Sequence, residues 1–400
     1  MRILCFVTPR RRELTKHKMA SHGASSGAAF IVQRVREGGR VVIPFGDADA
    51  FAADIARVLA TTSPEQPITA FHWDGRDGDD DATDDATEVL AHALAAHAPA
   101  LQALTLRHWV FRPKGIAAVA NLVAEHPALA VLDLSRSSFL PPAGLLDVVA
   151  AAGRSKTLRA LTLDHVRGVV GIDETTVALV VGAALSETRT LDYLDMRRTY
   201  IGPGVARAIA DALELGTSKL AALDLGDNVL GDTGAVAIAH ALRVNKTLTT
   251  LRLDRNSIHD VGGAAIADAL ADSPECRITE LRLEGNSLSD AVMFPLLLAQ
   301  GRTHRMETLR LDPQHALGAP ATMAMRSHAL RLATERRSTA VRQFLAFMGA
   351  YVPGRTLRPT RGSPAAQRLV FADGDHAVSW RVLAHLIRAA SEMTPDVDEA

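Results

Sequence analysis

The sequence is poor in aromatic residues, which make up 4% of its 400 positions. A core with so few rings must rely on Leu, Ala, Val and Ile, which belong to the 48% of residues that are hydrophobic. An excess of one charge is also lacking, because 44 Lys and Arg against 45 Asp and Glu leave a formal net charge of -1. No global field therefore favours nucleic acid, and any basic site must be local.

Cysteine is equally scarce, and long apolar runs are missing from the sequence. With two cysteines, Cys5 and Cys276, a disulfide framework is not predicted, and we expect a reducing compartment, the cytoplasm. No apolar run reaches the roughly 18 residues of a membrane-spanning helix. We expect residues 1–27 to form a disordered or basic N-terminal arm. Residues 1–36 faintly resemble an organellar transit segment, and a start at Met19 is the plain alternative.

Signatures of catalysis are missing as well. The sequence has no GxxxxGK[ST] loop, no GxSxG, no HExxH and no CxxC pair, so neither enzyme activity nor a cofactor is predicted. The acidic stretch 74–88 has the carboxylate spacing of a calcium loop from Asp77 to Glu88, but Ala82 stands where that loop requires glycine. We interpret it as a solvated loop whose acids favour the dipole of the next helix, and no metal site is predicted.

What the sequence does contain is a repeat. The word LxxLxL recurs at steps of 28, 29, 33, 29, 28, 30 and 28 residues, and a degenerate copy begins at Ile68. The clear copies begin at Leu101, Leu129, Leu158, Leu191, Leu220, Leu248, Ile278 and Met306. A fixed period of this size predicts stacked coils in a solenoid, here with nine candidate strands over 68–312.

Each copy leads into a turn and an apolar helix, most clearly in LDLGDNVLGDTGAVAIAHAL from Leu223. Alternation along the strand predicts that Leu223 and Leu225 point inward and Asp224 outward. An Asn that follows the strand can bond backbone groups of the turns between adjacent coils. The residues at this position are Asn228, Asn256 and Asn286. Gly231 suits the tight connection into the helix.

The pattern LxxLxLxxNxL followed by a helix resembles the leucine-rich repeat family, and within it the ribonuclease-inhibitor-like class. The resemblance covers about 60% of the chain. It implies an α/β fold, a horseshoe-shaped solenoid with parallel strands on the concave face and helices on the convex face. Other residues take the place of the Asn in several copies. They are Trp109, Ser137, Val166, Thr199 and Gln314.

We expect the repeat array to span residues 67–319. An N-terminal cap or degenerate coil is predicted over 28–66, with a strand at 40–45 and a helix at 47–60. After the array we expect a helical cap over 320–350, a linker over 351–366 and a helical segment with a frayed tail over 367–400. Residues 320–368 carry nine arginines against one acid, which makes this segment a candidate contact for an acidic partner, RNA or an anionic membrane, with a solvated helix face as the plainer interpretation.

On the last three strands the exposed positions form two ladders. Arg252, Arg282 and Arg310 occupy the middle exposed position, and acids occupy the position two residues later. Because parallel strands lie about 4.8 Å apart, we expect each arginine to pair with the row of acids. Exposed pairs of this kind contribute little, about 0–1 kcal/mol each.

The middle strands are less evenly balanced, and Tyr193 adds an aromatic ring. Because Tyr and Arg are favoured as interface anchors, this region is the predicted binding surface. Trp109 is a further candidate at the N-terminal end, with core filling at the turn as its alternative. The residues expected to bind a partner are Arg107, Trp109, Arg136, Tyr193, Asp195, Arg197, Arg198, Asp224, Asp227, Arg252, Arg255 and Arg282.

These expectations converge on a scaffold that recognises another protein through its concave face. The first alternative is a GTPase-activating protein for a small GTPase, because the array resembles the activating protein of the Ran GTPase. That family carries a strongly acidic tail, whereas this chain ends in DVDEA. The second is a fragment similar to innate sensors or effectors, although the sequence has no P-loop.

Overall fold

The computed structural model describes residues 33–311, apart from 34, 36, 44–47, 62–66, 76–83, 167–170, 274–275, 290, 293–294, 297–298, 300–305 and 307. The predicted N-terminal arm, the C-terminal cap, the linker, the final helical segment and the arginine-rich segment 320–368 all lie outside these residues.

Ten parallel strands form one sheet in which the strands follow one another in chain order. The strands are β1 (Gly39–Ile43), β2 (Ile68–Asp74), β3 (Ala103–Arg107), β5 (Val131–Asp133), β7 (Ala160–Thr162), β8 (Tyr193–Asp195), β9 (Ala222–Asp224), β10 (Thr250–Arg252), β11 (Glu280–Arg282) and β12 (Thr308–Arg310). Two short strands, β4 (Val110–Phe111) and β6 (Ser138–Phe139), pair in the turns. The sheet therefore contains the nine predicted strands of the repeat and also β1, which overlaps the strand predicted at 40–45 and pairs with β2.

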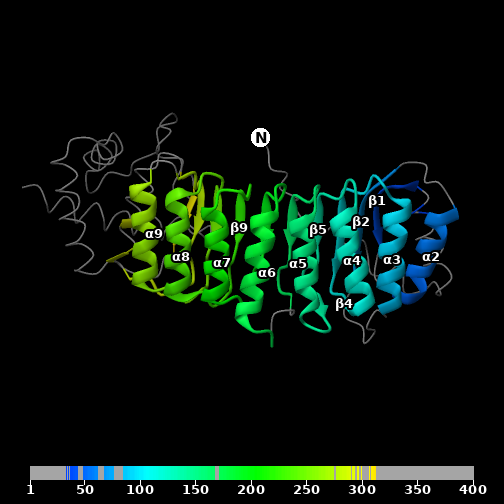
Figure 1. Ribbon diagram of the computed structural model, residues 1–400, viewed down its shortest axis with the longest axis horizontal. Helices are drawn as coiled ribbons and strands as arrows, with labels where there is room; N and C mark the ends of the chain where they lie inside the picture. Colours follow the sequence, from blue (N-terminus) through cyan, green and yellow to red (C-terminus); the bar gives the residue numbers. More distant parts are fainter. Residues whose placement is uncertain are drawn as a thin grey trace, which may run out of the picture.

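A helix follows each strand from β1 to β10 of the main sheet, and neighbouring helices pack against each other. The helices are α2 (Ala48–Thr61), α3 (Asp84–His97), α4 (Pro113–Glu125), α5 (Gly144–Arg154), α6 (Glu174–Glu187), α7 (Pro203–Glu214), α8 (Gly231–Val244) and α9 (Asp260–Asp272). Figure 1 shows them side by side as one layer on one side of the sheet. The predicted α/β solenoid is confirmed, and no helix among the described residues covers the other face of the sheet, here called the open face.

The core lies between the strands and this helical layer. Leu223 and Leu225 are fully buried, as the alternation along the strand predicts, and burying a leucine side chain contributes about 1.5–3 kcal/mol. Small residues let the helices approach the strands and one another. Gly153 in α5 illustrates the fit, because a Cβ placed there would lie 2.6 Å from the Cα of Ala184 in α6.

Buried asparagines join successive coils, as predicted. Asn256 is 0% exposed, and its Nδ2 donates to the carbonyl oxygen of Leu225 in the preceding coil at 2.8 Å. The Oδ1 of Asn286 accepts the backbone N–H of Asn256 at 2.8 Å and that of Ile258 at 3.1 Å. Each amide therefore satisfies backbone groups that would otherwise be buried without partners.

Where the Asn is replaced, hydroxyls take over part of its role. The Oγ of Ser137 accepts the backbone N–H of Trp109 at 3.0 Å and donates to the carbonyl oxygen of Leu106 at 3.2 Å. The Oγ1 of Thr199 donates to the carbonyl oxygen of Met196 at 2.6 Å. A hydroxyl can accept and donate, but it has fewer donors than the amide, so these coils have fewer links.

Candidate protein-binding surface

The open face of the sheet carries three rows of side chains at its centre. Hydrogen-bonded register places equivalent residues of β8, β9, β10 and β11 beside one another. The first row is Tyr193, Ala222, Thr250 and Glu280, and the middle row is Asp195, Asp224, Arg252 and Arg282. The end row, just beyond the strands, is Arg197, Gly226, Asp254 and Glu284. The predicted site residues of these coils are therefore brought together on one surface.

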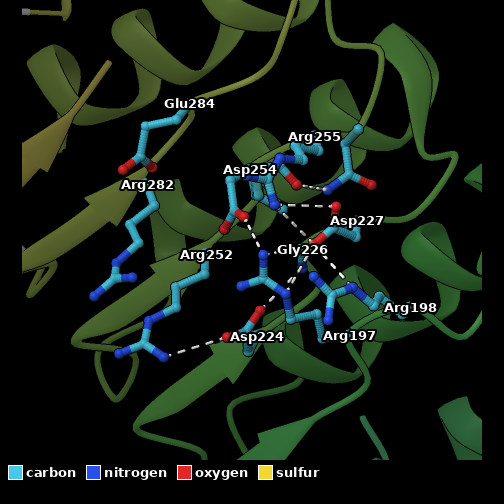
Figure 2. A network of polar contacts seen from close by, with 12 residues as sticks. Arg197, Arg198, Asp224, Gly226, Asp227, Arg252, Asp254, Arg255, Arg282 and Glu284 are labelled. Carbon is cyan, nitrogen blue, oxygen red and sulfur yellow. Dashed lines mark hydrogen bonds and ion pairs between the residues drawn. The ribbon is translucent and has the colours of Figure 1, made fainter. Parts of the chain in front are cut away.

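Arg197 is the centre of the ion-pair network on this surface (Figure 2). Its Nε donates to Oδ2 of Asp227 at 2.9 Å, and its Nη2 donates to Oδ2 of Asp254 at 2.7 Å. Burial alone would lower the pKa of Arg197, but the hydrogen bond to Asp227 and the charge of Asp254 outweigh it and raise that pKa. The guanidinium is thus held as a fixed cation between two carboxylates from the next two coils.

Gly226 makes this span possible. It occupies the end-row position between Arg197 and Asp254, and Figure 2 shows it among their side chains. A Cβ at Gly226 would lie 2.9 Å from Oδ1 and 3.1 Å from Cγ of Asp254. A side chain there would displace the carboxylate that Arg197 binds. Our sequence interpretation did not single out this glycine.

Asp227 is shared by three arginines. Besides Arg197, the Nε of Arg198 lies 3.4 Å and the Nη1 of Arg255 lies 3.3 Å from its Oδ2. Burial works against ionisation, but the hydrogen bond from Arg197 and the nearby guanidinium charges prevail and lower the pKa of Asp227. Asp227, Arg198 and Arg255 occupy the same place in successive coils, and all have a left-handed backbone, with φ of 53°, 54° and 53°.

Asp195 and Asp224 form the least compensated part of the surface. They are register partners on β8 and β9, and they are 9% and 3% exposed. Each accepts the backbone N–H two residues further along at 3.0 Å, from Arg197 and Gly226 respectively. Asp224 also lies 3.3 Å from Nη1 of Arg252, whereas no Lys or Arg forms an ion pair with Asp195 in the part of the chain that the structure describes.

The protonation of the two carboxyls reflects this difference. Burial, together with the charge of Asp224, raises the pKa of Asp195 to about 7. Burial also raises the pKa of Asp224, although the backbone N–H of Gly226 and the charge of Arg252 act in the opposite direction. Tyr193 donates its hydroxyl to Oδ2 of Asp195 at 3.3 Å, and burial and these carboxylates raise the pKa of its phenol.

The arginine ladder of the last coils pairs differently from our prediction. Arg252 contacts Glu280 at 3.2 Å and Asp224 at 3.3 Å, and Arg282 contacts Glu280 at 2.7 Å. Arg310 alone follows the predicted pattern among these three, with Glu284 at 3.9 Å. Arg252 and Arg282 therefore share Glu280, an acid of the first row, and do not pair with the acids of the end row. The place of Glu280 two residues before Arg282 in the strand was the signal that could have identified it.

The expectation that Trp109 contacts a partner is wrong. Trp109 is 2% exposed and packs edge-on to Trp73 at 5.0 Å and against Phe111 at 6.2 Å between ring centroids. The reason is its place in the repeat, because it stands where other coils carry the inward-pointing Asn. A bulky apolar ring at that position fills the interior, and core filling was the alternative.

The remaining predicted residues lie nearer the N-terminal end. Arg107 donates through Nε to Oδ2 of Asp133 at 2.8 Å, and Arg136 is exposed in a left-handed turn. In the acidic stretch, Asp85 pairs with Lys114 at 2.8 Å, while Asp77 lies outside the described residues. Among the residues that the structure describes, no group of three or more His, Cys, Asp or Glu side chains is arranged to hold a metal ion.

Comparison with known proteins identifies the repeat. The pattern of the leucine-rich repeat matches residues 218–239 and 244–267, which include β9, β10, most of α8 and the buried Asn228 and Asn256. The chain contains leucine-rich repeats. A ribonuclease inhibitor from Sus scrofa is 28% identical over 132 residues, 33% of this chain and 29% of that protein. A ribonuclease inhibitor from Mus musculus is 28% identical over 116 residues, 29% of this chain and 25% of that protein. Over these stretches the repeats are similar to those of ribonuclease inhibitors.

A third relative is the mouse NACHT, LRR and PYD domains-containing protein 4C, 28% identical over 107 residues, or 27% of this leucine-rich repeat chain and 11% of that protein. Among solved structures, a chain of the yeast Rad7–Elc1 complex overlaps 68% of this chain and 70% of its own, with 14% identity and a TM-score of 0.40. An internalin from Listeria monocytogenes overlaps 75% and 92%, with 13% identity and a TM-score of 0.38. The matches to the sequence relatives span less than a third of each relative.

No helix among the described residues is long and apolar enough to cross a membrane.

Proposed function

We propose that this leucine-rich repeat protein is a scaffold that binds a partner protein on the open face of its sheet. One observation carries the proposal: a charged network, fixed on rigid strands, lies on a face that no described helix covers. Fixed polar groups on a rigid scaffold suit recognition, because little side-chain freedom is lost when a partner docks. The likeness to ribonuclease inhibitors, which by name act on another protein, supports a binding role.

The middle coils are the proposed centre of the contact. Here arginine and carboxylate side chains from β8 to β11 lie on strands in register, and the central pairs link coils rather than neighbours in the chain. Ion pairs on such a surface set specificity and the rate of association more than affinity. The proposal includes a cytoplasmic location, in keeping with a sequence that has two cysteines, Cys5 and Cys276, and so no disulfide framework. No described residue favours the GTPase-activating alternative.

Affinity capture by the intact chain tests this function. We would compare the wild type with a double variant, Arg252→Gln and Arg282→Gln, whose side chains are 27% and 26% exposed on the open face. A matched control replaces exposed arginines of the helical layer, Arg207→Gln and Arg243→Gln. The expected result is that the first variant loses proteins that the wild type and the control both retain. Equal capture by all three would refute binding through the open face.

A further inference from the structure

Tyr200 combines two properties that rarely coincide. Its side chain is 67% exposed, and its backbone is left-handed with φ of 60°. For a bulky residue this conformation is unfavourable, because the Cβ crowds the following carbonyl oxygen. The hydroxyl makes no hydrogen bond within the described part of the chain. An exposed aromatic held in an unfavourable conformation contributes little to folding, so its presence points to contact with something else.

Val229 extends the apolar surface into the next coil. It follows Asn228 as Tyr200 follows Thr199, so the two side chains stand at the same place in adjacent coils. The backbone N–H of Val229 donates to the carbonyl oxygen of Ile201 at 3.0 Å, which shows that the two turns lie side by side. Val229 is 56% exposed. In the following coils serines occupy this place, namely Ser257 and Ser287, so the apolar pair is local.

Cations border this apolar pair. Arg198 precedes Tyr200 by two residues with a side chain that is 42% exposed, and Arg255 lies one coil beyond Val229 and is 59% exposed. Both share the one carboxylate of Asp227, which is 18% exposed and already binds Arg197. Three guanidinium groups carry many more N–H donors than this carboxylate can accept, and most of these donors form no hydrogen bond with the residues that the structure describes.

In the ion pairs of this surface the arginine and the acid differ in exposure in a consistent direction. In every ion pair described between Arg197, Arg198, Arg252 or Arg255 and an acid, the arginine side chain is the more exposed member. The contrast is clear for Arg252 with Asp224, at 27% against 4%, and for Arg255 with Asp227, at 59% against 18%. The acids therefore lie beneath the arginines, and an approaching molecule meets positive charge first.

We propose that Tyr200, Val229, Arg198 and Arg255, here called the rim patch, bind an acidic segment of a partner protein. The segment carries carboxylates for the two arginines and an aliphatic or aromatic side chain that packs on Tyr200 and Val229. Exposed Tyr and Arg around a small apolar centre are the composition of interface anchors. This inference rests on the proposed function, and adds where the anchor lies and which chemistry it takes.

Selection from a phage-displayed random peptide library on the intact chain provides the test. Enriched peptides would be synthesised and their affinities measured by fluorescence anisotropy, beside copies in which Asp and Glu are replaced by Asn and Gln. The key variant is Tyr200→Asn, because Asn accepts a left-handed backbone and removes the ring without a folding penalty. Leu179→Asn is the matched control, since Leu179 is 69% exposed on α6 in the helical layer.

We expect acidic peptides with an apolar residue to be enriched. Their affinity should fall roughly tenfold or more in Tyr200→Asn and in the pair Arg198→Gln and Arg255→Gln, and stay unchanged in Leu179→Asn. The thermal midpoint of Tyr200→Asn should equal or exceed that of the wild type. Recovery of no acidic peptide, or equal affinity for Tyr200→Asn, would overturn the proposal. A change in oligomeric state in Tyr200→Asn would overturn it too, because the occupant would then be a second copy.

The same variants separate this inference from the proposed function. If Arg252→Gln with Arg282→Gln loses captured proteins while Tyr200→Asn retains them all, the open face binds a partner and the rim patch is wrong. The opposite result has two parts: peptide binding depends on Tyr200, and the open-face variant captures the same proteins as the helical-layer control. The rim patch then binds an acidic segment, and binding through the rest of the open face is refuted.

Discussion

Replacing Asp195 by Asn should stabilise the folded chain at high pH and have little effect at low pH. Asp195 is 9% exposed and faces Asp224 across the β8–β9 register, so its ionised form is unfavourable in the folded state. The introduced asparagine would keep an oxygen for the backbone N–H of Arg197 and gain a donor toward Asp224. The substitution therefore removes a buried charge and retains the local hydrogen bond.

The magnitude follows from the shift in protonation. Burial and the charge of Asp224 raise the pKa of Asp195 from its ordinary 3.8 to about 7. Each pKa unit corresponds to about 1.4 kcal/mol, so the full shift corresponds to about 4 kcal/mol. Because Asp224 titrates with it and shares the charge, we expect a gain of about 2 kcal/mol or more from the substitution at pH 8.

The sign of the pH dependence is fixed by the direction of that shift. A carboxyl with a raised pKa binds its proton more tightly in the folded chain than in the unfolded chain. Its contribution to stability is fully present below pH 3.8 and is lost as the pH rises toward about 7. The difference between Asp195→Asn and wild type should therefore be clearly smaller at pH 5 than at pH 8.

Urea denaturation at both pH values measures this difference. Asp211→Asn on α7, where the carboxyl is exposed, is the matched control and should shift neither curve. A gain of equal size at pH 5 and pH 8, or a loss at pH 8, would contradict the assignment of an unfavourable charge to Asp195.

Three further predictions concern the framework. Asn256→Ala should lower the free energy of unfolding by about 1–3 kcal/mol for each buried backbone group left without its partner. The control Asn121→Ala, on the exposed side of α4, should change that free energy little. Equal effects of the two substitutions in urea titrations would contradict the role of Asn256 in linking coils. Gly226→Ala should lower the free energy of unfolding by about 1–3 kcal/mol, because the added methyl group crowds Asp254. A urea midpoint equal to that of the wild type would show that the Asp254 carboxylate moves aside freely. Trp109→Ala should cost about 3–5 kcal/mol in the same assay, and an effect below about 1 kcal/mol would contradict its place in the core.

The repeat word predicted most of the framework because it encodes periodic burial. Leu223 and Leu225 alternate with Asp224 in the sequence, and the two leucines are buried in the core while Asp224 pairs with Arg252. Asn256 and Asn286 recur at one position, and their side chains bridge coils as that position requires. Both features follow from local spacing, so a single sequence is sufficient to predict them.

The ion pairs of the open face were harder to predict, because the acid that an arginine contacts depends on the row in which each side chain lies. Trp109 was assigned by residue type, as an interface aromatic, when its place in the repeat at the Asn position determined its burial. Tyr200 was missed because a left-handed turn leaves few traces in the sequence. Gly285 was a trace only of the position two residues before that of Tyr200: it stands at the place of Asp227 and Arg255, and all three have positive φ. Glycine in one coil indicated the backbone of its equivalents.

Arg197 has a consequence for how the array unfolds. In a stack where each coil contacts only its neighbours, segments can open one after another from an end. The bond from Arg197 to Asp254 passes over Gly226 and joins residues 57 positions apart, from one coil to the second one after it. Loss of the coil that contains β10 therefore removes support directly from the coil that contains β8. The centre of the array should open as a single cooperative block, with fraying confined to the coils outside it.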